Sequence, residues 1–366
     1  MEWRIPGENS GHHEQLGLIS TECNVSAKIL LCKCLPPQVL SEYDFSMKAC
    51  IQSRTRNDLA RKVICMSVLL LCFALSATPV FAQSVKEVVP RTAVVSAFSP
   101  ELTLLKSEIQ NSSSTSINGI EFQTGKLAGK DVVLFLSGIS IVNATMTVQL
   151  ALDHFNIKQV IFSGIAGGAD PELDIGDVVI ADQWGQYLEM VYARKVDNGW
   201  ETIPFFEYPH ENFGMMFPRS VEVIRDGLNE PETRFWFPVD ESLLAQAKQA
   251  ASGLELSHCT EDGRCLSQKP KVVIGGSGVS GSAFIDNAEF REYAFRVFQS
   301  RVIDMESSAV AHVAWANKVP FLAIRSLSDL AGAGDHENQI EIFTSLAAEN
   351  SAKVVMSLLG SMASEQ

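Results

Sequence analysis

Two neighbouring segments of the chain place carboxylates at the ends of buried strands. The first, Val302-Ile-Asp-Met-Glu-Ser-Ser-Ala-Val-Ala311, is a short apolar run followed by acidic residues and then by small residues that begin a helical pattern. The second, Pro320-Phe-Leu-Ala-Ile-Arg-Ser-Leu-Ser-Asp329, is a buried-type strand that ends in polar residues. Open α/β sheets bind their ligands where strands give way to loops or helices. The two segments therefore favour an α/β fold in which Glu306 and Asp329 do acid–base work on a polar substrate.

The rest of the chain from Thr92 onward supports this fold class, because strand-like and helix-like patterns alternate. Strands are expected at 92–97, 120–124, 132–136, 159–162, 178–181, 271–274 and around Val302. Helices are expected at 100–109, 143–155, 241–251, 289–298, 307–317 and 340–359. With 366 residues, 46% of them hydrophobic, the chain can bury one large core or two small ones. The net charge of −14 argues against a nucleic-acid partner, since phosphate contacts need a basic surface.

An apolar run near the amino-terminal end resembles a secretory signal. The run, 63–77, follows Arg61 and Lys62 and leads to small residues that end at Ala82. At about 15 residues it is short for a membrane span, which needs roughly 20, so a cleaved signal peptide is favoured over a retained anchor. We expect residues 47–82 to be the signal region, with cleavage after Ala82, and residues 1–46 to be a non-native or disordered extension. The mature protein, residues 83–366, is then secreted or periplasmic and has no membrane segment.

Export would place the last two cysteines of the chain in an oxidising compartment. Six of the eight cysteines lie before residue 83, and only Cys259 and Cys265 lie beyond it. In an oxidising compartment these two are expected to form a disulfide across a short loop. Two free surface thiols are the alternative. A metal site is disfavoured because the pair lacks a second pair of ligands, and we expect neither a metal nor a cofactor.

The regular pattern breaks down between residues 184 and 238. This segment is rich in aromatic residues, proline and glycine. Long segments of this kind are either functional lids or insertions, or aromatic clusters that pack on the main core. The sequence leaves both readings open.

Three glycine-rich stretches follow predicted strands: Ser137-Gly-Ile-Ser140, Ser163-Gly-Ile-Ala-Gly-Gly168 and Gly275-Gly-Ser-Gly-Val-Ser-Gly281. As turns, they would let backbone N–H groups approach a ligand closely. None has the spacing of a P-loop or of a dinucleotide fingerprint. They predict a pocket built from backbone and small side chains around a flat, polar ligand.

Four motifs together resemble the purine and uridine phosphorylase superfamily. They are Ser163-Gly-Ile-Ala-Gly-Gly-Ala-Asp-Pro-Glu-Leu-Asp-Ile-Gly-Asp-Val-Val179, Val279-Ser-Gly-Ser-Ala-Phe-Ile285, Asp304-Met-Glu-Ser-Ser-Ala309 and Arg325-Ser-Leu-Ser-Asp329. Within it, they are most similar to methylthioadenosine/S-adenosylhomocysteine nucleosidases, over residues 92 to 359. The long middle segment and the cysteine loop also resemble the secreted plant branch that includes bark storage proteins. The resemblance implies a single-domain, three-layer fold with a central mixed, twisted sheet flanked by helices.

The resemblance also implies roles for single residues. Asp329 would protonate N7 of a leaving purine, Glu306 would hold the ribose hydroxyls, and Glu101 would bind and activate water. Further binding positions are assigned to Met305 against the sugar, Phe284 and Ile285 at the base, Arg325 and Ser328 as groups that orient the acid, Gly167 and Ile165 in the glycine-rich stretch, and Phe343, which would reach a neighbouring subunit's site. Taken singly, Glu101 and Glu306 also suit the first turn of a helix, and Asp329 suits a cap or turn.

Phosphate ligands distinguish a hydrolase from a phosphorylase in this superfamily. The phosphorylases carry an arginine and a serine or threonine at positions that are Phe162 and Ile165 here. Neither side chain can bind an oxyanion, which requires donors or positive charge. We therefore predict an N-ribosyl hydrolase that acts with water on a purine nucleoside or a 5′-thio-substituted adenosine, as a homo-oligomer. The alternatives are a phosphorolytic enzyme and a catalytically weak nucleoside-binding or storage protein. We expect His312 to pack within a helix and His336 to lie at the surface.

Overall fold

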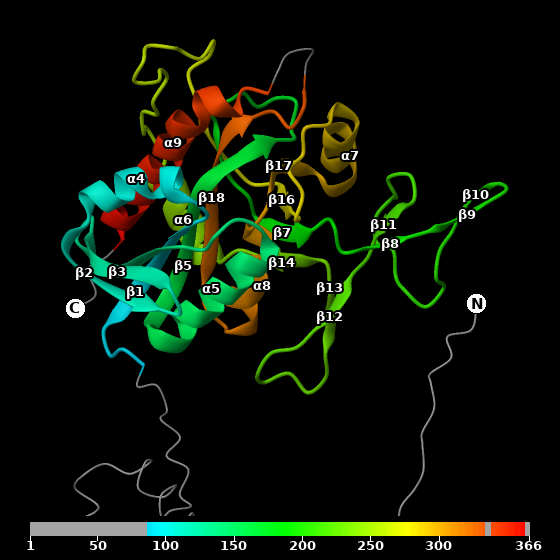
Figure 1. The fold of residues 1–366 in the computed structure, drawn as a ribbon, viewed down its shortest axis with the longest axis horizontal. Helices are drawn as coiled ribbons and strands as arrows, with labels where there is room; N and C mark the ends of the chain where they lie inside the picture. Colours follow the sequence, from blue (N-terminus) through cyan, green and yellow to red (C-terminus); the bar gives the residue numbers. More distant parts are fainter. Residues whose placement is uncertain (1–85, 334–337, 363–366) are drawn as a thin grey trace, which may run out of the picture. The chain divides into compact units, whose positions relative to one another are not determined.

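A computed structural model describes residues 86–333 and 338–362. One mixed β-sheet runs through this part of the chain (Figure 1). Its central strands are β1 (Pro90–Ser96), β4 (Lys130–Leu136), β5 (Asn156–Gly168) and β18 (Phe321–Asp329), which are parallel to one another. On one side the sheet continues antiparallel through β3 (Ile120–Leu127) to β2 (Gln110–Ile117). On the other side β5 meets β17 (Ser300–Asp304), followed by β16 (Ser277–Ser280), β7 (Gln183–Gln186) and β14 (Trp236–Pro238). Strand β6 (Val178–Ile180) joins β18 to β15 (Val272–Ile274).

Helices cover both faces of the sheet, which confirms the three-layer α/β fold. Helices α4 (Ser99–Glu108), α6 (Glu241–Ala250) and α9 (Ile340–Ser361) pack together on one face (Figure 1). Helices α5 (Ile141–His154) and α8 (Ser307–Ala316) pack on the other, and α7 (Ala288–Phe298) lies against β17. The central strands are buried almost throughout, as the continuous apolar runs in the sequence require.

Two of the predicted glycine-rich turns are strands in the structure. The stretch 163–168 continues β5 and pairs with β18 and β17, and 277–280 forms β16. Glycine gives no apolar signal, so the sequence pattern ended β5 early and did not reveal β16, a separate strand that pairs with β17 and β7. Strand β2 was missed for a related reason, because its Ser-rich sequence is exposed along its length and shows no alternation. The 137–140 stretch is a loop, as expected.

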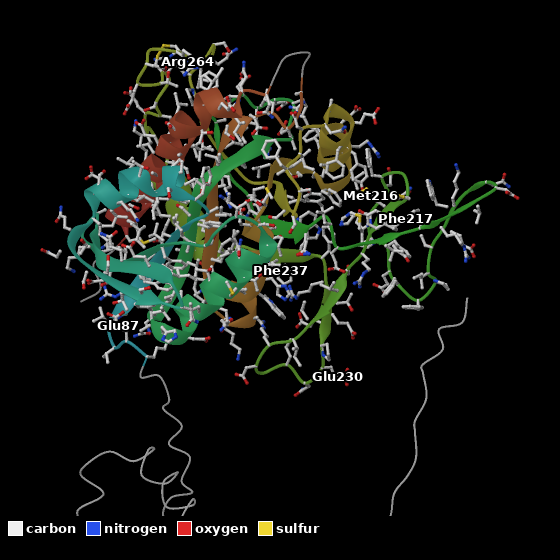
Figure 2. The ribbon with its side chains drawn as sticks, in the orientation of Figure 1. Glu87, Met216, Phe217, Glu230, Phe237 and Arg264 are labelled. Carbon is white, nitrogen blue, oxygen red and sulfur yellow. A yellow bond between two sulfur atoms is a disulfide. The ribbon has the colours of Figure 1, made fainter. Side chains whose placement is uncertain are left out.

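The segment 184–238 contains short antiparallel hairpins besides the sheet strands at its ends. These pair β8 (Met190–Tyr192) with β11 (Met216–Pro218), β9 (Arg194–Val196) with β10 (Gly199–Glu201), and β12 (Val221–Val223) with β13 (Glu232–Arg234). The hairpins extend away from the main body (Figure 1), and Figure 2 shows Met216 and Phe217 on them, apart from Phe237 in the body. Near the body, this segment packs into a second aromatic cluster that includes Tyr187, Phe235 and Phe298.

Among the described residues, no helix combines the length and apolarity that a membrane span requires. The predicted signal region, the predicted extension at 1–46 and His336 lie outside the described residues.

Candidate active site

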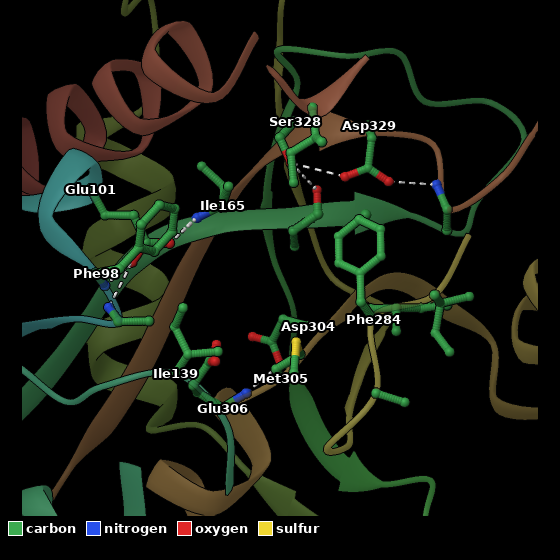
Figure 3. Close-up of a pocket in the computed structure, with 18 residues that line it drawn as sticks. Phe98, Glu101, Ile139, Ile165, Phe284, Asp304, Met305, Glu306, Ser328 and Asp329 are labelled. Atoms are coloured by element: carbon green, nitrogen blue, oxygen red, sulfur yellow. Dashed lines mark hydrogen bonds between the residues drawn. The ribbon is translucent and has the colours of Figure 1, made fainter. Parts of the chain in front are cut away.

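A cavity of about 180 Å³ opens where the carboxyl ends of β5, β17 and β18 meet the start of α4 (Figure 3). Residues from segments far apart in the sequence line it: Ala97, Phe98, Glu101, Ile139, Ile165, Ala166, Gly167, Ala283, Phe284, Ile285, Ile303, Asp304, Met305, Glu306, Ser328, Asp329, Ala331 and Ile340. The parallel strands β5 and β18 bring their carboxyl ends to one edge of the sheet, and β17 pairs antiparallel with the last residues of β5. Most of the predicted site residues are therefore gathered around one cavity.

Glu101 is buried and held by three backbone donors. Its Oε2 accepts hydrogen bonds from the N–H groups of Ala97 at 2.6 Å and Phe98 at 3.2 Å, and its Oε1 accepts from Ile165 at 2.7 Å. Burial raises the pKa of this carboxyl group, while Arg325 and the three N–H donors oppose the rise. Glu101 thus lies within the first turn of α4, and the backbone of β5 fixes its carboxylate at the cavity wall.

Arg325 lies beneath the cavity floor and is fully buried. Its guanidinium approaches three carboxylates, with Nε 2.7 Å from Asp304 Oδ2, Nη2 3.3 Å from Glu306 Oε2 and Nη1 3.6 Å from Glu101 Oε1. Burial alone would lower the pKa of Arg325, but these carboxylates outweigh it and raise the pKa. The sequence placed Arg325 beside Asp329. The structure places its guanidinium among the carboxylates of Glu101, Asp304 and Glu306 instead.

Glu306 stands at the N-cap position of α8 and is 5% exposed. Its Oε1 accepts a hydrogen bond of 2.7 Å from the backbone N–H of Ser140. Burial raises its pKa to about 7, with Asp304 and Glu101 adding to the rise and Arg325 opposing it. One guanidinium does not neutralise three carboxylates, so at least one of them gains a proton easily.

Asp329 ends β18 on the opposite wall of the cavity (Figure 3). Its Oδ1 accepts a hydrogen bond of 2.8 Å from the N–H of Ala331, and its Oδ2 accepts one of 3.0 Å from the hydroxyl of Ser328. Burial raises its pKa despite these bonds. Gly167 leaves room beside the carboxylate, since a Cβ there would come within 3.2 Å of Asp329 Oδ1. A buried carboxyl group with a raised pKa suits a general acid.

Apolar side chains complete the walls. The ring of Phe284 stands between Asp329 and Met305 in Figure 3 and is 54% exposed. Ile285 follows it along the wall. Phe343 is buried on α9, at 8% exposed, and is not among the residues that line the cavity. Its predicted contact with a second subunit stays a prediction.

Sequence reasoning missed two contributors to the site, Asp304 and Ser140. Asp304 accepts hydrogen bonds from the hydroxyls of Ser280 and Ser307 and so anchors Arg325. Ser140 supplies its backbone N–H to Glu306. The sequence shows an acidic residue at position 304, two residues before Glu306. It does not show the partners of Asp304, because they come from other strands and helices.

The other sequence assignments have clear outcomes. Cys259 and Cys265 form a disulfide on an exposed loop, where Figure 2 shows Arg264. Together with His258 they bring possible ligand atoms within 4.8 Å of one another, but two bonded sulfurs are not available as thiolate ligands. His312 stacks on Phe237 with ring centroids 4.4 Å apart, which confirms the packing role expected of it.

Comparison with known proteins places this chain in a family. The family model described as the Phosphorylase superfamily matches residues 91–360. The chain belongs to the phosphorylase superfamily. Relatives in this superfamily include the 5′-methylthioadenosine/S-adenosylhomocysteine nucleosidase of a Marinomonas species, 32% identical over 73% of this chain and 96% of the relative. The same enzyme of Geobacillus kaustophilus is 31% identical over 74% of this chain and 97% of the relative.

Solved structures of the superfamily share the fold. The nucleosidase of Colwellia psychrerythraea, in complex with adenine, matches with a TM-score of 0.56 and 28% identity over 74% of this chain and 95% of that one. The nucleosidase of Neisseria meningitidis, in complex with methylthio-immucillin-A, has a TM-score of 0.55 and 27% identity over 75% and 100% of the two chains. The futalosine hydrolase of Helicobacter pylori has a TM-score of 0.56 and 25% identity over 75% and 99%.

Phe162 and Ile165 occupy the two positions at which the sequence analysis looked for phosphate ligands. Phe162 is fully buried, and the Arg325 guanidinium lies 4.0 Å from its ring centroid, away from the cavity surface. Ile165 lines the cavity with an apolar side chain, while its backbone N–H serves Glu101. Neither side chain offers a donor to an anion.

Proposed function

We propose that this protein is a purine nucleosidase that hydrolyses the N-glycosidic bond of a purine nucleoside or of a 5′-thio-substituted adenosine, with water as the nucleophile. One observation carries the proposal. Four carboxylates line a single cavity, and none of the described residues that line it is lysine, arginine or histidine. The nucleosidase relatives and the adenine-bound structural neighbour support the choice of substrate class.

The charge of the cavity favours water over phosphate. A bound phosphate dianion needs positive charge or several donors, whereas Glu101 and Glu306 would repel it. Arg325, the guanidinium beneath the floor, is fully buried and engaged by three carboxylates. Water is uncharged and can donate a hydrogen bond to Glu101, so the same groups that exclude phosphate retain water.

We assign separate tasks to three of the four carboxylates, while Asp304 holds Arg325. Asp329 faces the ring of Phe284, so a purine stacked on that ring lies beside a carboxyl group whose raised pKa equips it to protonate N7. Glu306, beside Met305, accepts the ribose hydroxyls. Glu101 holds the attacking water across the sugar from the base. As the glycosidic bond breaks, its electron pair passes to the base and the proton from Asp329 neutralises the base, while water adds to the ribosyl carbon and gives up a proton to Glu101.

The decisive experiment is the release of adenine from methylthioadenosine by purified protein, with and without inorganic phosphate. We expect equal release in both conditions, with free 5-methylthioribose as the second product. Release that requires phosphate and yields a ribose 1-phosphate would show that the protein is a phosphorylase. Tight binding of the nucleoside without turnover would support a binding or storage protein instead.

We further propose that the mature chain begins at Gln83, is exported, and carries its two cysteines as a disulfide. The signal-like run at 63–77 and the pairing of Cys259 with Cys265 support this. Intact-mass analysis of protein recovered after expression with its leader should give the mass that begins at Gln83, lowered by about two hydrogen atoms relative to the reduced form. Two alkylatable thiols or an uncleaved leader would contradict export.

The homo-oligomer is also a proposal, and exposed apolar side chains support it. Ile139, Val142 and Met146 lie at and just before the start of α5 and are 48%, 74% and 57% exposed. Val142 and Met146 lie one turn apart on α5 and so share a face of that helix, and Ile139 precedes the helix by two residues. Sedimentation of the wild type should reveal a dimer or larger species that Val142→Asp weakens. A wild type that stays monomeric at micromolar concentration would end this proposal.

A further inference from the structure

Ser140 has a backbone conformation that residues with a side chain rarely adopt. Its φ is 83° and its ψ is 161°, a region that is populated almost entirely by glycine because a Cβ strains it. A glycine at this position would relieve the strain. The surroundings of Ser140 must therefore hold the serine in place.

Two hydrogen bonds do so, and they lead to opposite walls of the cavity. The backbone N–H of Ser140 donates to Glu306 Oε1 at 2.7 Å. Its hydroxyl donates to the hydroxyl of Ser282 at 2.8 Å. A glycine could make the first bond but not the second. The hydrogen bond from the hydroxyl is therefore the interaction that serine makes at this position and glycine cannot make.

Ser282 belongs to the loop 281–287, which carries Phe284. Other described residues also tie this loop to the rest of the protein, among them Asn338, whose Nδ2 donates a hydrogen bond of 2.9 Å to Asp286 Oδ1. Gly281 and Asn287 fasten its two ends by backbone hydrogen bonds of 3.2 and 3.1 Å, and the hydroxyl of Tyr187 reaches the carbonyl of Ala283 at 3.3 Å. Gly281 binds the carbonyl of Asp304, two residues before Glu306, so the bond from Ser140 to Ser282 is a second tie between this loop and the Glu306 side of the cavity, and it is made by side chains.

We propose that Ser140 is a positioning residue that fastens the Phe284 loop to the glutamate on the opposite wall, so that the base and ribose sites keep a fixed separation. The proposal rests on the proposed function, because it takes Phe284 and Glu306 as ligands of base and sugar. Its effect is on substrate binding. The distance between two sites that hold one rigid nucleoside sets how well both are filled at once.

The test compares Ser140→Gly and Ser282→Ala, each of which removes the hydroxyl pair. Both should raise KM for methylthioadenosine about threefold, as expected for one solvent-exposed hydrogen bond, with kcat changed less than twofold. The double variant should be no worse than either single variant, because both changes remove the same bond. The melting temperature of Ser140→Gly should not fall, since relief of strain offsets the lost bond. A merely structural role would lower stability and leave KM unchanged.

A matched control is Ala128→Gly, which relieves a positive φ of 47° in the β3–β4 turn, away from the cavity. It should leave KM unchanged. Hydrogen exchange of the amides in 281–287 gives a second readout that needs no turnover, and it should speed up in Ser140→Gly and Ser282→Ala but not in the control. Unchanged exchange and unchanged KM in both variants would overturn the proposal. If the wild type releases no adenine, the proposed function fails, whereas the exchange experiment still decides the tie between Ser140 and the loop.

Discussion

Asp329 and Glu101 show how residue environment separates roles among identical functional groups. Both carboxyls are buried, and burial raises the pKa of each. Glu101 is surrounded by three N–H donors and approached by Arg325, which favour its charged form. Asp329 has one backbone donor and one hydroxyl and lies away from Arg325. The environments thus suit an anion that orients water and an acid that donates a proton.

Asp329→Asn should lower kcat by about 10² to 10⁴ with little change in nucleoside affinity. The amide keeps the size of the side chain and one accepting oxygen, but its NH2 group cannot accept the second hydrogen bond and does not act as an acid toward N7. Single-turnover kinetics and equilibrium binding of an adenosine analogue separate the two effects. Near-normal turnover would remove Asp329 from the mechanism.

Gly164→Ala should destabilise the protein by about 1–3 kcal/mol and impair activity. A Cβ at this position would lie 2.1 Å from Arg325 Nη1 and 2.4 Å from Glu101 Oε1, so the buried ion pair would have to move. The matched control is Gly360→Ala in α9, where a Cβ finds its nearest atom at 3.9 Å. The control should be neutral or slightly stabilising, because alanine favours a helix. Chemical denaturation measures both, and equal effects would contradict the steric argument.

At the scale of the elements, the N-terminus of α8, the end of β17 and the middle of β18 assemble one charged cluster. The end of β17 carries Asp304, which meets Arg325 in the middle of β18, and α8 begins directly after Glu306. The positive end of a helix dipole favours an anion there, yet burial dominates and raises the pKa of Glu306 to about 7. The helix start therefore carries a carboxyl group that titrates near neutral pH.

This shift predicts how stability depends on pH. The folded protein holds the Glu306 proton more tightly than the unfolded chain, whose glutamate has an ordinary pKa near 4.5. The contribution of this group is therefore complete below about pH 4.5 and is lost as pH rises to about 7. Unfolding free energies of the ligand-free protein across this range should fall more steeply for the wild type than for Glu306→Gln. Parallel curves for the two proteins would show that Glu306 titrates normally.

At the scale of the whole molecule, the segment 184–238 divides into an anchored part and a projecting part. Its ends carry Tyr187 and Phe235, which are buried in the second aromatic cluster. Its middle carries the β9–β10 hairpin, whose side chains are exposed throughout. No residue between 189 and 234 lines the cavity within the described chain. The ends of the segment therefore pack as an aromatic cluster, one of the two alternatives that the sequence left open. Within one chain, the β9–β10 hairpin does not line the cavity as a lid would.

Replacing residues 194–201 with two glycines should leave the melting temperature within about 2 °C of the wild type. The hairpin buries no side chain, and its ion pair between Arg194 and Glu201 is exposed and worth little. Thermal unfolding measures the effect, with sedimentation at the same concentration to detect changed assembly. A large loss of stability would mean that the hairpin packs against a second subunit.

The sequence by itself determined the fold class, the positions of the main helices and the carboxylates at the cavity. Buried strands have apolar runs and helices have a 3.6-residue period, so both can be recognised from residues that are neighbours in the sequence. The tertiary structure alone decided which carboxylate meets which partner. Arg325 turned toward Glu101, Asp304 and Glu306 rather than Asp329, and Ser140 joined Glu306 to Ser282. It also extended β5 through Gly164 and Gly168, because strand pairing and close packing, not side-chain periodicity, hold glycine in a sheet. Such contacts join residues far apart in the sequence, so they cannot be predicted from the pattern of neighbouring residues.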